Sequence, residues 1–374
     1  MLDELTRAVL NREEVSRYLD GTKGERGDDV RARIQGYLEE LKTTQRYSFY
    51  KALKHPLYPI LRKIDRVGEH IDLVKSTVRG SRVVYASNHR SHCDYLVELL
   101  VLDENGVRPP IIAAGINLFG GPLGLLHRHV TGAIPIRRNS RDPLYLITLK
   151  AYVAELLRKH DFFFYPEGGR SYNGELKSPK TGLMQAALQA DRHELSIVPM
   201  AVAYDLVLED RILSREAVRR RGRPFAQEIA EMARHAVGYR SRAFVTFGQP
   251  IALATFDPES RRDLVTLAHR VQDAVGLAYK VLPTALVASA MRAQISRREL
   301  GDRLDELVAT LAGDGANLAV RTGQEALDDG VAMLAERGIL VDGRGRIRVR
   351  DRIALRYYAR TIQHLVQRRA RTMH

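Results

Sequence analysis

The stretch SNHRSHCDYL, Ser87–Leu96, contains two side chains that could work as a catalytic pair. His89 and Asp94 stand five positions apart, and on one continuous helix they would point about 140° away from each other. The apolar run SRVVYASNH before them predicts a buried strand, so that His89 lies in a loop and a helix begins near Ser91. Asp94 can then fold back onto the imidazole, orient it and leave one ring nitrogen free to take a proton from an alcohol. A pair that only caps the helix start is the open alternative, and Arg90 receives no role.

The remaining histidines and the single cysteine offer other chemistry. Cys93 could be a nucleophile with His89 or His92 as its base, but adjacent residues on a helix point apart, and a lone thiol is commonly a small buried group. A metal site would draw its ligands from His89, His92, His127 and His129, which lack the spacing of a zinc site. We therefore expect His92 and Cys93 to pack locally, and we expect no metal.

A second cluster lies in FFFYPEGGRSYNGELKSPKTG, residues 162–182, where an apolar strand runs into a glycine-rich loop. The polar side chains of this loop are Glu167, Arg170, Ser171, Lys177 and Lys180. Glycine lets the backbone approach a ligand closely, and cations at a sheet edge favour an anion such as phosphate. The order of residues is not that of a P-loop. A turn with solvated basic residues is the alternative.

Two arginines end a third apolar segment, GAIPIRRN. Arg137 and Arg138 each present a planar fork of donors that fits a phosphate through two hydrogen bonds. Paired arginines at a strand end are more often solvated surface, so this segment is informative only in combination with the others.

The elements that must position these residues follow an alternating pattern. Strand-like and helix-like segments alternate over residues 76–255, which predicts an α/β catalytic domain with a central, mostly buried sheet flanked by helices. Residues 1–75 have a charged helical pattern, and residues 256–374 form a mainly helical region. VDGRGRIRVR in that last region has the turn chemistry of a small β-hairpin. Helices followed by a hairpin resemble a winged helix, which keeps DNA binding open as an alternative.

The charge of the chain indicates which partners it attracts. Its 374 residues include 59 Lys and Arg against 45 Asp and Glu, a net charge of +14, which favours nucleic acid, anionic lipid headgroups or phosphorylated substrates. The aromatic pattern of an RNA-binding sheet and zinc-finger spacings are missing, which makes nucleic acid the weaker candidate. One cysteine and a polar N-terminal stretch predict a reducing, cytoplasmic location. Three prolines and four glycines in Pro109–Leu126 disfavour a membrane span there.

Four segments, taken in order, resemble the sequence blocks of the glycerolipid acyltransferase family. His89 and Asp94 match its H-x4-D block, and GAIPIRR matches a G-x-x-F-I-(D/R)-R block with Pro135 at the usual phenylalanine. YPEGGRS from Tyr165 matches F-P-E-G-x-R-S, and IVPMAVAYD around Pro199 matches a V-P-V type block. HRSHCDYL, AGINL and EGGRS resemble the glycerol-3-phosphate and dihydroxyacetone-phosphate branch. LPTALVASAM and LRYYARTIQHL resemble segments downstream of the catalytic domain in the much longer bacterial membrane enzymes of that branch.

The resemblance implies a reaction and a set of site residues. His89 would deprotonate the 1-hydroxyl of glycerol 3-phosphate, Asp94 would orient it, and the alkoxide would attack the thioester of acyl-CoA or acyl carrier protein. No cofactor or metal is implied. The residues that match the substrate-binding blocks, with the arginines on the phosphate, are Arg137, Arg138, Glu167, Gly168, Arg170, Ser171 and Pro199. We add Lys180 to this set from its place in the glycine-rich loop.

A lipid product implies a membrane surface as a partner. The basic segment YKALKHPLYPILRKI could bind anionic headgroups without spanning the bilayer, so we expect peripheral association on the cytoplasmic side of the cell membrane, and no nucleic acid. Two alternatives stay open. The acceptor could instead be dihydroxyacetone phosphate or lysophosphatidate, or the chain could be a non-catalytic basic protein that binds lipid or nucleic acid.

Overall fold

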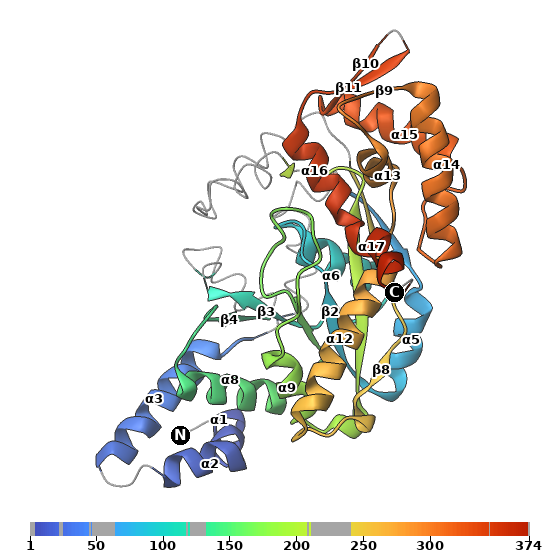
Figure 1. Cartoon of the computed structure of the whole chain (residues 1–374). Coiled ribbons are helices and arrows are strands. Elements are labelled where there is room, and N and C mark those ends of the chain that lie inside the picture. The colour runs from blue at the N-terminus through green and yellow to red at the C-terminus, as the bar shows by residue number, and fades with distance from the viewer. Residues whose placement is uncertain are drawn as a thin grey trace.

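A computed structural model of the chain has the predicted α/β architecture, a central sheet with helices on both faces (Figure 1). The residues that the structure describes are 4–21, 25–44, 46, 64–116, 119, 132–207, 209–210, 241–343 and 345–372. Apart from Ile64, the basic segment YKALKHPLYPILRKI lies outside these residues, as do His127 and His129.

Eight strands form the central sheet within the described residues. They are β1 (Ile64–Glu69), β2 (Arg82–Ser87), β3 (Ile111–Gly115), β4 (Ala133–Ile136), β5 (Phe162–Phe164), β6 (Leu195–Tyr204), β7 (Ser241–Phe247) and β8 (Ile251–Ala252). Their order is β1-β7-β6-β2-β5-β3-β4, and β8 pairs with β6. The five strands from β6 to β4 run parallel, whereas β7 is antiparallel to β6. The carboxyl ends of these five strands therefore share one edge of the sheet, where α/β folds bind their ligands.

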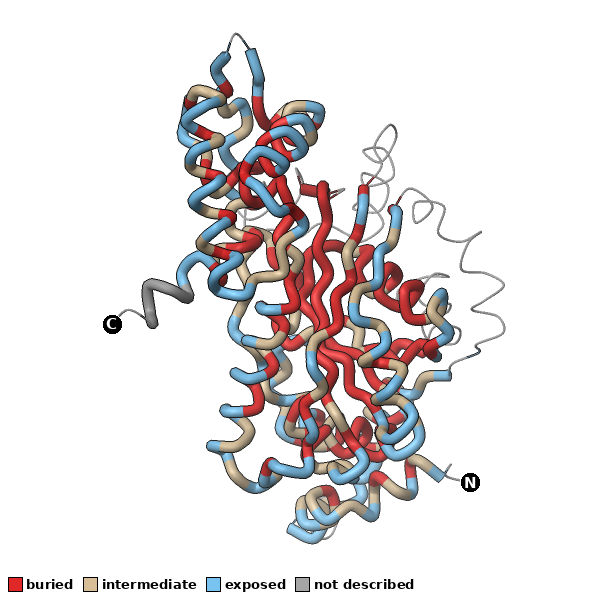
Figure 2. The backbone as a smooth tube through the Cα atoms, turned by 90° about the vertical axis from the view of Figure 1, so that its right-hand side faces the viewer, coloured by how far each residue is buried: buried red, intermediate tan, exposed pale blue. Residues whose placement is uncertain are grey.

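The two faces of β2 point into two apolar cores. Val83 and Tyr85 join one core, Val84 and Ala86 join the other, and all four are fully buried. This alternation follows from the strand geometry, in which successive side chains point to opposite faces. Figure 2 shows the strands as a buried layer between helices that contain both buried and exposed residues. A sheet covered on both faces needs apolar residues at nearly every position, which explains the continuous apolar runs in the sequence.

Different helices cover the two faces of the sheet. One core includes buried residues of α5 (Ile71–Gly80) and α6 (Asp94–Glu104), and the other includes residues of α8 (Pro143–Leu156), α9 (Gly182–Leu188) and α12 (Arg261–Ala278). Short 3-10 helices, η3 (Arg192–Glu194) and η4 (Leu253–Thr255), flank the start of β6 and the end of β8. The helix α12 lies in the region predicted to follow the catalytic domain, yet it packs on β6.

The N-terminal region contains three helices that pack on α8, and one strand that the sequence pattern did not predict. The helices are α1 (Glu4–Leu10), α2 (Glu13–Asp20) and α3 (Glu25–Leu41). The helical pattern of residues 1–75 did not predict β1, which pairs with β7 in the central sheet. Only the first residue of β1 is buried, so its sequence, IDRVGE, lacks the apolar run of an inner strand. The domain limits at residues 75 and 255 stay a prediction.

The C-terminal region stands beside one end of the sheet (Figure 1). Its helices are α13 (Pro283–Ala290), α14 (Arg297–Gly313), α15 (Gly323–Glu336), α16 (Arg352–Thr361) and α17 (Gln363–Thr372). The predicted hairpin is confirmed as β10 (Leu340–Gly343) and β11 (Arg346–Val349), to which β9 (Gln294–Ser296) adds a third strand. Among the described residues, no helix is both long enough and apolar enough to cross a membrane.

Candidate active site

His89 and Asp94 meet at the carboxyl end of β2. The helix α6 begins at Asp94, and the Nδ1 atom of His89 lies 2.8 Å from Oδ2 of Asp94. The same carboxylate accepts hydrogen bonds from the backbone N–H groups of Arg90 (2.5 Å) and Ser91 (2.8 Å), and from the hydroxyl of Tyr204 (2.8 Å). Both N–H groups precede α6, so Asp94 closes the loop and orients the histidine rather than capping its own helix.

The protonation states of His89 and Asp94 allow His89 to act as a base. Burial lowers the pKa of His89 well below its usual value, and the neighbouring cations, first Arg170 and then Arg138, lower it further. Burial raises the pKa of Asp94 to about 6, although hydrogen bonds to the carboxylate oppose the rise. Near neutral pH the imidazole is therefore neutral and the carboxylate is ionised. Nδ1 then donates its proton to Asp94, and Nε2 carries the lone pair that can accept a proton.

An aromatic ring fixes the plane of the imidazole. The rings of His89 and Tyr165 are stacked with their centroids 4.0 Å apart and an interplanar angle of 8°. The Tyr165 hydroxyl donates to the buried carboxyl of Glu98 (2.8 Å), which also accepts a hydrogen bond from Ser87. No sequence pattern predicts a site role for Tyr165, Glu98 or Tyr204. The one available signal was Glu98 itself, an acidic residue inside the apolar helix DYLVELLVL, because a buried carboxyl needs partners.

Glu167 and Ser171 join the glycine-rich loop to the histidine loop. The Glu167 carboxylate accepts hydrogen bonds from the backbone N–H groups of His89 and Lys177, both at 3.1 Å. The N–H of Ser171 donates to the carbonyl of His89 (2.9 Å), and the Ser171 hydroxyl donates to the carbonyl of Glu175 (2.7 Å). Both side chains are buried and neither lines the cavity beside His89. This arrangement does not fit the expected contact with substrate, because these polar groups already bind the protein.

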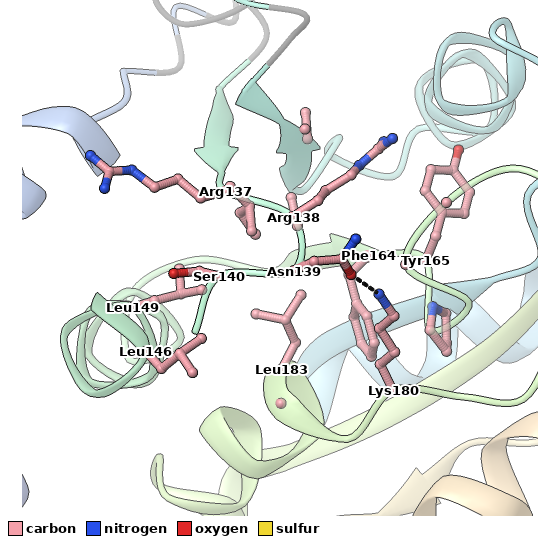
Figure 3. A pocket seen from close by; sticks show the side chains of 18 of the residues that line it. Arg137, Arg138, Asn139, Ser140, Leu146, Leu149, Phe164, Tyr165, Lys180 and Leu183 are labelled. Atoms are coloured by element: carbon pink, nitrogen blue, oxygen red, sulfur yellow. Dashed lines mark hydrogen bonds between the residues drawn. The ribbon is translucent and has the colours of Figure 1, made fainter. Parts of the chain in front are cut away.

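A cavity of about 430 Å³ opens beside His89 at the carboxyl edge of the sheet (Figure 3). Its wall has two chemical parts. The basic and polar part includes Arg138, Asn139, Ser140, Lys150 and Lys180. The apolar part includes Ile136, Leu146, Leu149, Phe164 and Leu183.

The two arginines after β4 point in opposite directions (Figure 3). Arg137 donates to both carboxylate oxygens of Glu40 in α3 (2.8 and 2.5 Å), and its guanidinium lies 5.1 Å from the ring centroids of Tyr37 and Tyr145. Arg137 borders the cavity, but this pairing argues against the expected phosphate contact. Arg138 is exposed and lines the cavity.

Arg170 and Lys177 add positive charge close to His89 without lining the cavity. Arg170 is buried, with its guanidinium 3.9 Å from Glu209 and 5.2 Å from the ring of Tyr172. The Lys177 ammonium donates to the carbonyls of Gly169 and Arg170. Both cations act on His89 by lowering its pKa. Direct substrate contact by Arg170 is therefore not supported by its position.

Lys180 and Gly168 form one corner of the cavity. The ammonium of Lys180 donates to the side chain of Asn139 at 3.0 Å, the dashed line in Figure 3. Gly168 has a positive φ of 67°, and a Cβ there would lie 2.7 Å from Cδ of Lys180. Only glycine fits this position without moving the lysine.

Pro199, in contrast, is buried inside β6 opposite Ala86 and does not line the cavity, so its expected role in substrate binding is not supported.

Cys93 and His92 occupy packing positions. Burial raises the pKa of the Cys93 thiol well above its usual value and lowers the pKa of His92 to about 2. A protonated thiol is a poor nucleophile, so this placement agrees with the predicted packing role. Within the described residues, no three His, Cys, Asp or Glu side chains are grouped to hold a metal ion.

Comparison with known proteins identifies the class of this site. Residues 69–203 match the model of the acyltransferase family, and this stretch contains both loops that build the site. That part of the chain is therefore an acyltransferase domain, and the resemblance drawn from the sequence is confirmed.

More specific matches are proteins named glycerol-3-phosphate acyltransferase. The chain is 33% identical over 341 residues to one from Actinobacillus succinogenes, an alignment that covers 80% of this chain and 41% of the relative. It is 32% identical over 330 residues to one from Pasteurella multocida (78% and 40%) and 29% identical over 405 residues to one from Alteromonas mediterranea (97% and 49%). The chain thus spans less than half the length of these relatives.

Proposed function

We propose that this chain is a glycerol-3-phosphate 1-O-acyltransferase. The observation that carries the proposal is a buried histidine, oriented by a carboxylate, beside a cavity whose wall contains both basic and apolar side chains. A base alone would suit many reactions. The two kinds of side chain match two substrates, a small phosphorylated alcohol and a fatty acyl thioester, and the names of the relatives agree with this pair.

The reaction follows from the state of the histidine. Nε2 of His89 takes the proton of the 1-hydroxyl as the oxygen attacks the thioester carbonyl. Asp94 stabilises the imidazolium that forms. The tetrahedral intermediate collapses with loss of the thiolate, and the imidazolium returns the proton to that sulfur. The products are 1-acylglycerol 3-phosphate and the free thiol of CoA or acyl carrier protein.

The phosphate binds best at Arg138 and Lys180. Arg138 makes no hydrogen bond or ion pair with the described residues, and its fork of donors borders the cavity. Guanidinium and phosphate groups pair through two charge-assisted hydrogen bonds, and Lys180 supplies a second positive charge on the same wall.

The acyl chain fits the apolar wall. Leu149, Phe164 and Leu183 lie on the side of the cavity formed by α8, β5 and α9. Ligand cavities are commonly apolar with a few polar groups that fix orientation, and this division matches a fatty acyl thioester.

The protein would work at an anionic membrane surface, as a peripheral enzyme on the cytoplasmic side. Its lipid product supports this inference, and so does the net charge of +14.

One assay tests the proposal. The purified chain is incubated with radiolabelled glycerol 3-phosphate and either palmitoyl-CoA or palmitoyl carrier protein, with parallel reactions on dihydroxyacetone phosphate and 1-acylglycerol 3-phosphate. We expect thioester-dependent label in the lipid fraction, with glycerol 3-phosphate as the preferred acceptor. Preference for another acceptor would reassign the substrate. Absence of transfer to all three, together with lipid or DNA binding, would favour a non-catalytic protein.

A further inference from the structure

Arg90 stands inside the catalytic loop, but its side chain faces away from the substrate cavity. It is 1% exposed, and it does not line the cavity beside His89. Its Nη1 atom donates to the carbonyl of Glu175 (3.0 Å), and its guanidinium lies 5.6 Å from the ring of Tyr279. Burying a charged side chain costs free energy unless nearby groups compensate the charge. We therefore expect this arginine to have a function.

The other side of Arg90 faces a space that the C-terminal helices also border. A second, much smaller cavity is lined by Arg90, Tyr204, Tyr279, Thr284 of α13 and Tyr357 of α16. Four buried polar atoms on these residues have no hydrogen-bond partner within the described structure, namely Nε and Nη2 of Arg90, Oγ1 of Thr284 and the hydroxyl of Tyr357. Tyr204 also donates to Asp94, so one residue borders this cavity and holds the catalytic carboxylate.

The positive charge of Arg90 favours the ionised forms of Glu167 and Asp94, the two carboxylates that bind the backbone of the loops. Burial raises the pKa of Glu167, and Arg90 is the first of the groups that oppose this rise. Arg90 also lowers the pKa of Asp94. In their ionised form these carboxylates accept four backbone N–H bonds, from residues 89, 90, 91 and 177. Protonation would weaken these bonds, because charge-assisted hydrogen bonds are the stronger kind.

The glycine-rich loop touches α16 directly. Gly174 has a φ of 88°, and a Cβ at this position would lie 2.1 Å from the carbonyl oxygen of Tyr357. Arg360 of α16 forms an ion pair with Glu175 at 3.2 Å. The carbonyl of Glu175 is the same group that accepts the hydrogen bonds of Arg90 and Ser171. The helix α16, Arg90 and both loops therefore form one packed unit.

We propose that Arg90 is a positioning residue through which the C-terminal helices α13 and α16 hold the His89 loop and the Glu167 loop in the geometry needed for acyl transfer. The effect on the reaction rests on the proposed function. The effect on the two loops rests on the geometry alone.

Hydrogen–deuterium exchange of the free protein tests the positioning without any substrate. In Arg90→Met, which keeps the length of the side chain but not its charge, we expect faster exchange over residues 88–94 and 171–177 and no change in α8. Arg12→Met is the matched control, because Arg12 pairs with Glu14 and Glu155 in another part of the molecule. It should leave both loops unchanged. Unchanged exchange of the loops in a folded Arg90→Met protein would overturn the inference.

Two further variants keep the test decisive if Arg90→Met does not fold. Arg90→Lys retains the charge but not the fork of donors that binds the carbonyl of Glu175, and should speed exchange over residues 88–94 and 171–177 relative to the unmodified chain. Gly174→Ala retains Arg90 but pushes the loop away from α16, and should speed exchange in residues 171–177. If both leave the loops as protected as in the unmodified chain, the proposed link is wrong.

Kinetics then separates positioning from substrate binding. In Arg90→Met we expect kcat to fall about 10²-fold, the effect of a small misplacement of the reacting groups, with little change in the KM for glycerol 3-phosphate. The acid limb of the pH profile should move to higher pH, because Arg90 is one of the cations that lower the pKa of His89. A change in KM alone would contradict the inference. If the loops loosen but the unmodified chain has no acyltransferase activity, the proposed function fails and the positioning role stands.

Discussion

At the scale of single residues, His89 is constrained on three sides. Asp94 holds Nδ1, the ring of Tyr165 covers one face, and the carboxylate of Glu167 holds the backbone N–H. Only Nε2 is left for chemistry. Such preorganisation matters because a base works only within hydrogen-bond reach of the proton that it takes.

Replacing the base gives the first prediction. His89→Ala should lower kcat by about 10²- to 10⁴-fold, the usual contribution of a general base. Circular dichroism and the melting temperature should show that the variant still folds. Turnover close to that of the unmodified chain would exclude His89 as the base.

The second prediction concerns pH. The reaction needs neutral His89, and burial lowers the pKa of this group from its ordinary 6.5, so the neutral form persists to lower pH than for a free imidazole. We therefore expect the acid limb of kcat/KM to lie below pH 6.5. The measurement is a pH profile at constant ionic strength. An acid limb above pH 6.5 would mean that His89 is not held neutral by burial.

The third prediction separates the paired arginines. Arg138→Ala should raise the KM for glycerol 3-phosphate much more than the KM for the acyl donor, because it removes a charge-assisted contact to phosphate. Arg137→Ala is the matched control, since its guanidinium binds Glu40. It should change the KM for glycerol 3-phosphate less. If both substitutions raise this KM equally, Arg138 does not bind the phosphate in preference to Arg137.

At the scale of elements, the sequence predicted those strands whose burial makes them continuously apolar, such as β2, β5 and β6. It missed β1, because an edge strand with one buried residue has no such pattern. The His89–Asp94 contact could also be predicted, because both residues lie in one short strand-to-helix connection.

Contacts between distant parts of the chain could not be predicted in this way. Tyr204 lies 110 positions from Asp94, and Glu40 lies 97 positions from Arg137. A single sequence contains no signal for such pairs. For this reason neither the pairing of Arg137 with Glu40 nor the hydrogen bond from Tyr204 to Asp94 could be predicted.

The apolar wall of the cavity, built by α8, β5 and α9, gives the fourth prediction. Leu183→Trp should narrow this wall and shift the preference toward shorter acyl chains. Each methylene that the cavity excludes changes the ratio of kcat/KM values by roughly tenfold or more. The measurement is kcat/KM over a series of acyl-CoA lengths. Leu277→Trp, on an exposed part of α12, is the control, and an unchanged preference in Leu183→Trp would place the acyl chain elsewhere.

At the scale of the whole molecule, the family match covers only part of the structure that builds the site. It ends at residue 203, one residue before Tyr204 and well before the C-terminal helices. Yet Tyr204 holds Asp94, and α16 packs on the glycine-rich loop. The acyltransferase domain and the C-terminal helices therefore share a core and form one structural unit.

The fifth prediction follows from the charge of the whole chain. A net charge of +14 should draw the chain to anionic bilayers, where the proposed reaction would release its lipid product. The purified chain should sediment with phosphatidylglycerol-containing liposomes in dilute buffer and dissociate as salt is added, because screening shortens electrostatic attraction to about 8 Å at 0.15 M ionic strength. Liposomes of phosphatidylcholine alone are the control and should bind much less. Equal binding to both kinds of liposome, unaffected by salt, would indicate that apolar side chains insert into the bilayer. No binding to anionic liposomes at low salt would contradict membrane association through charge.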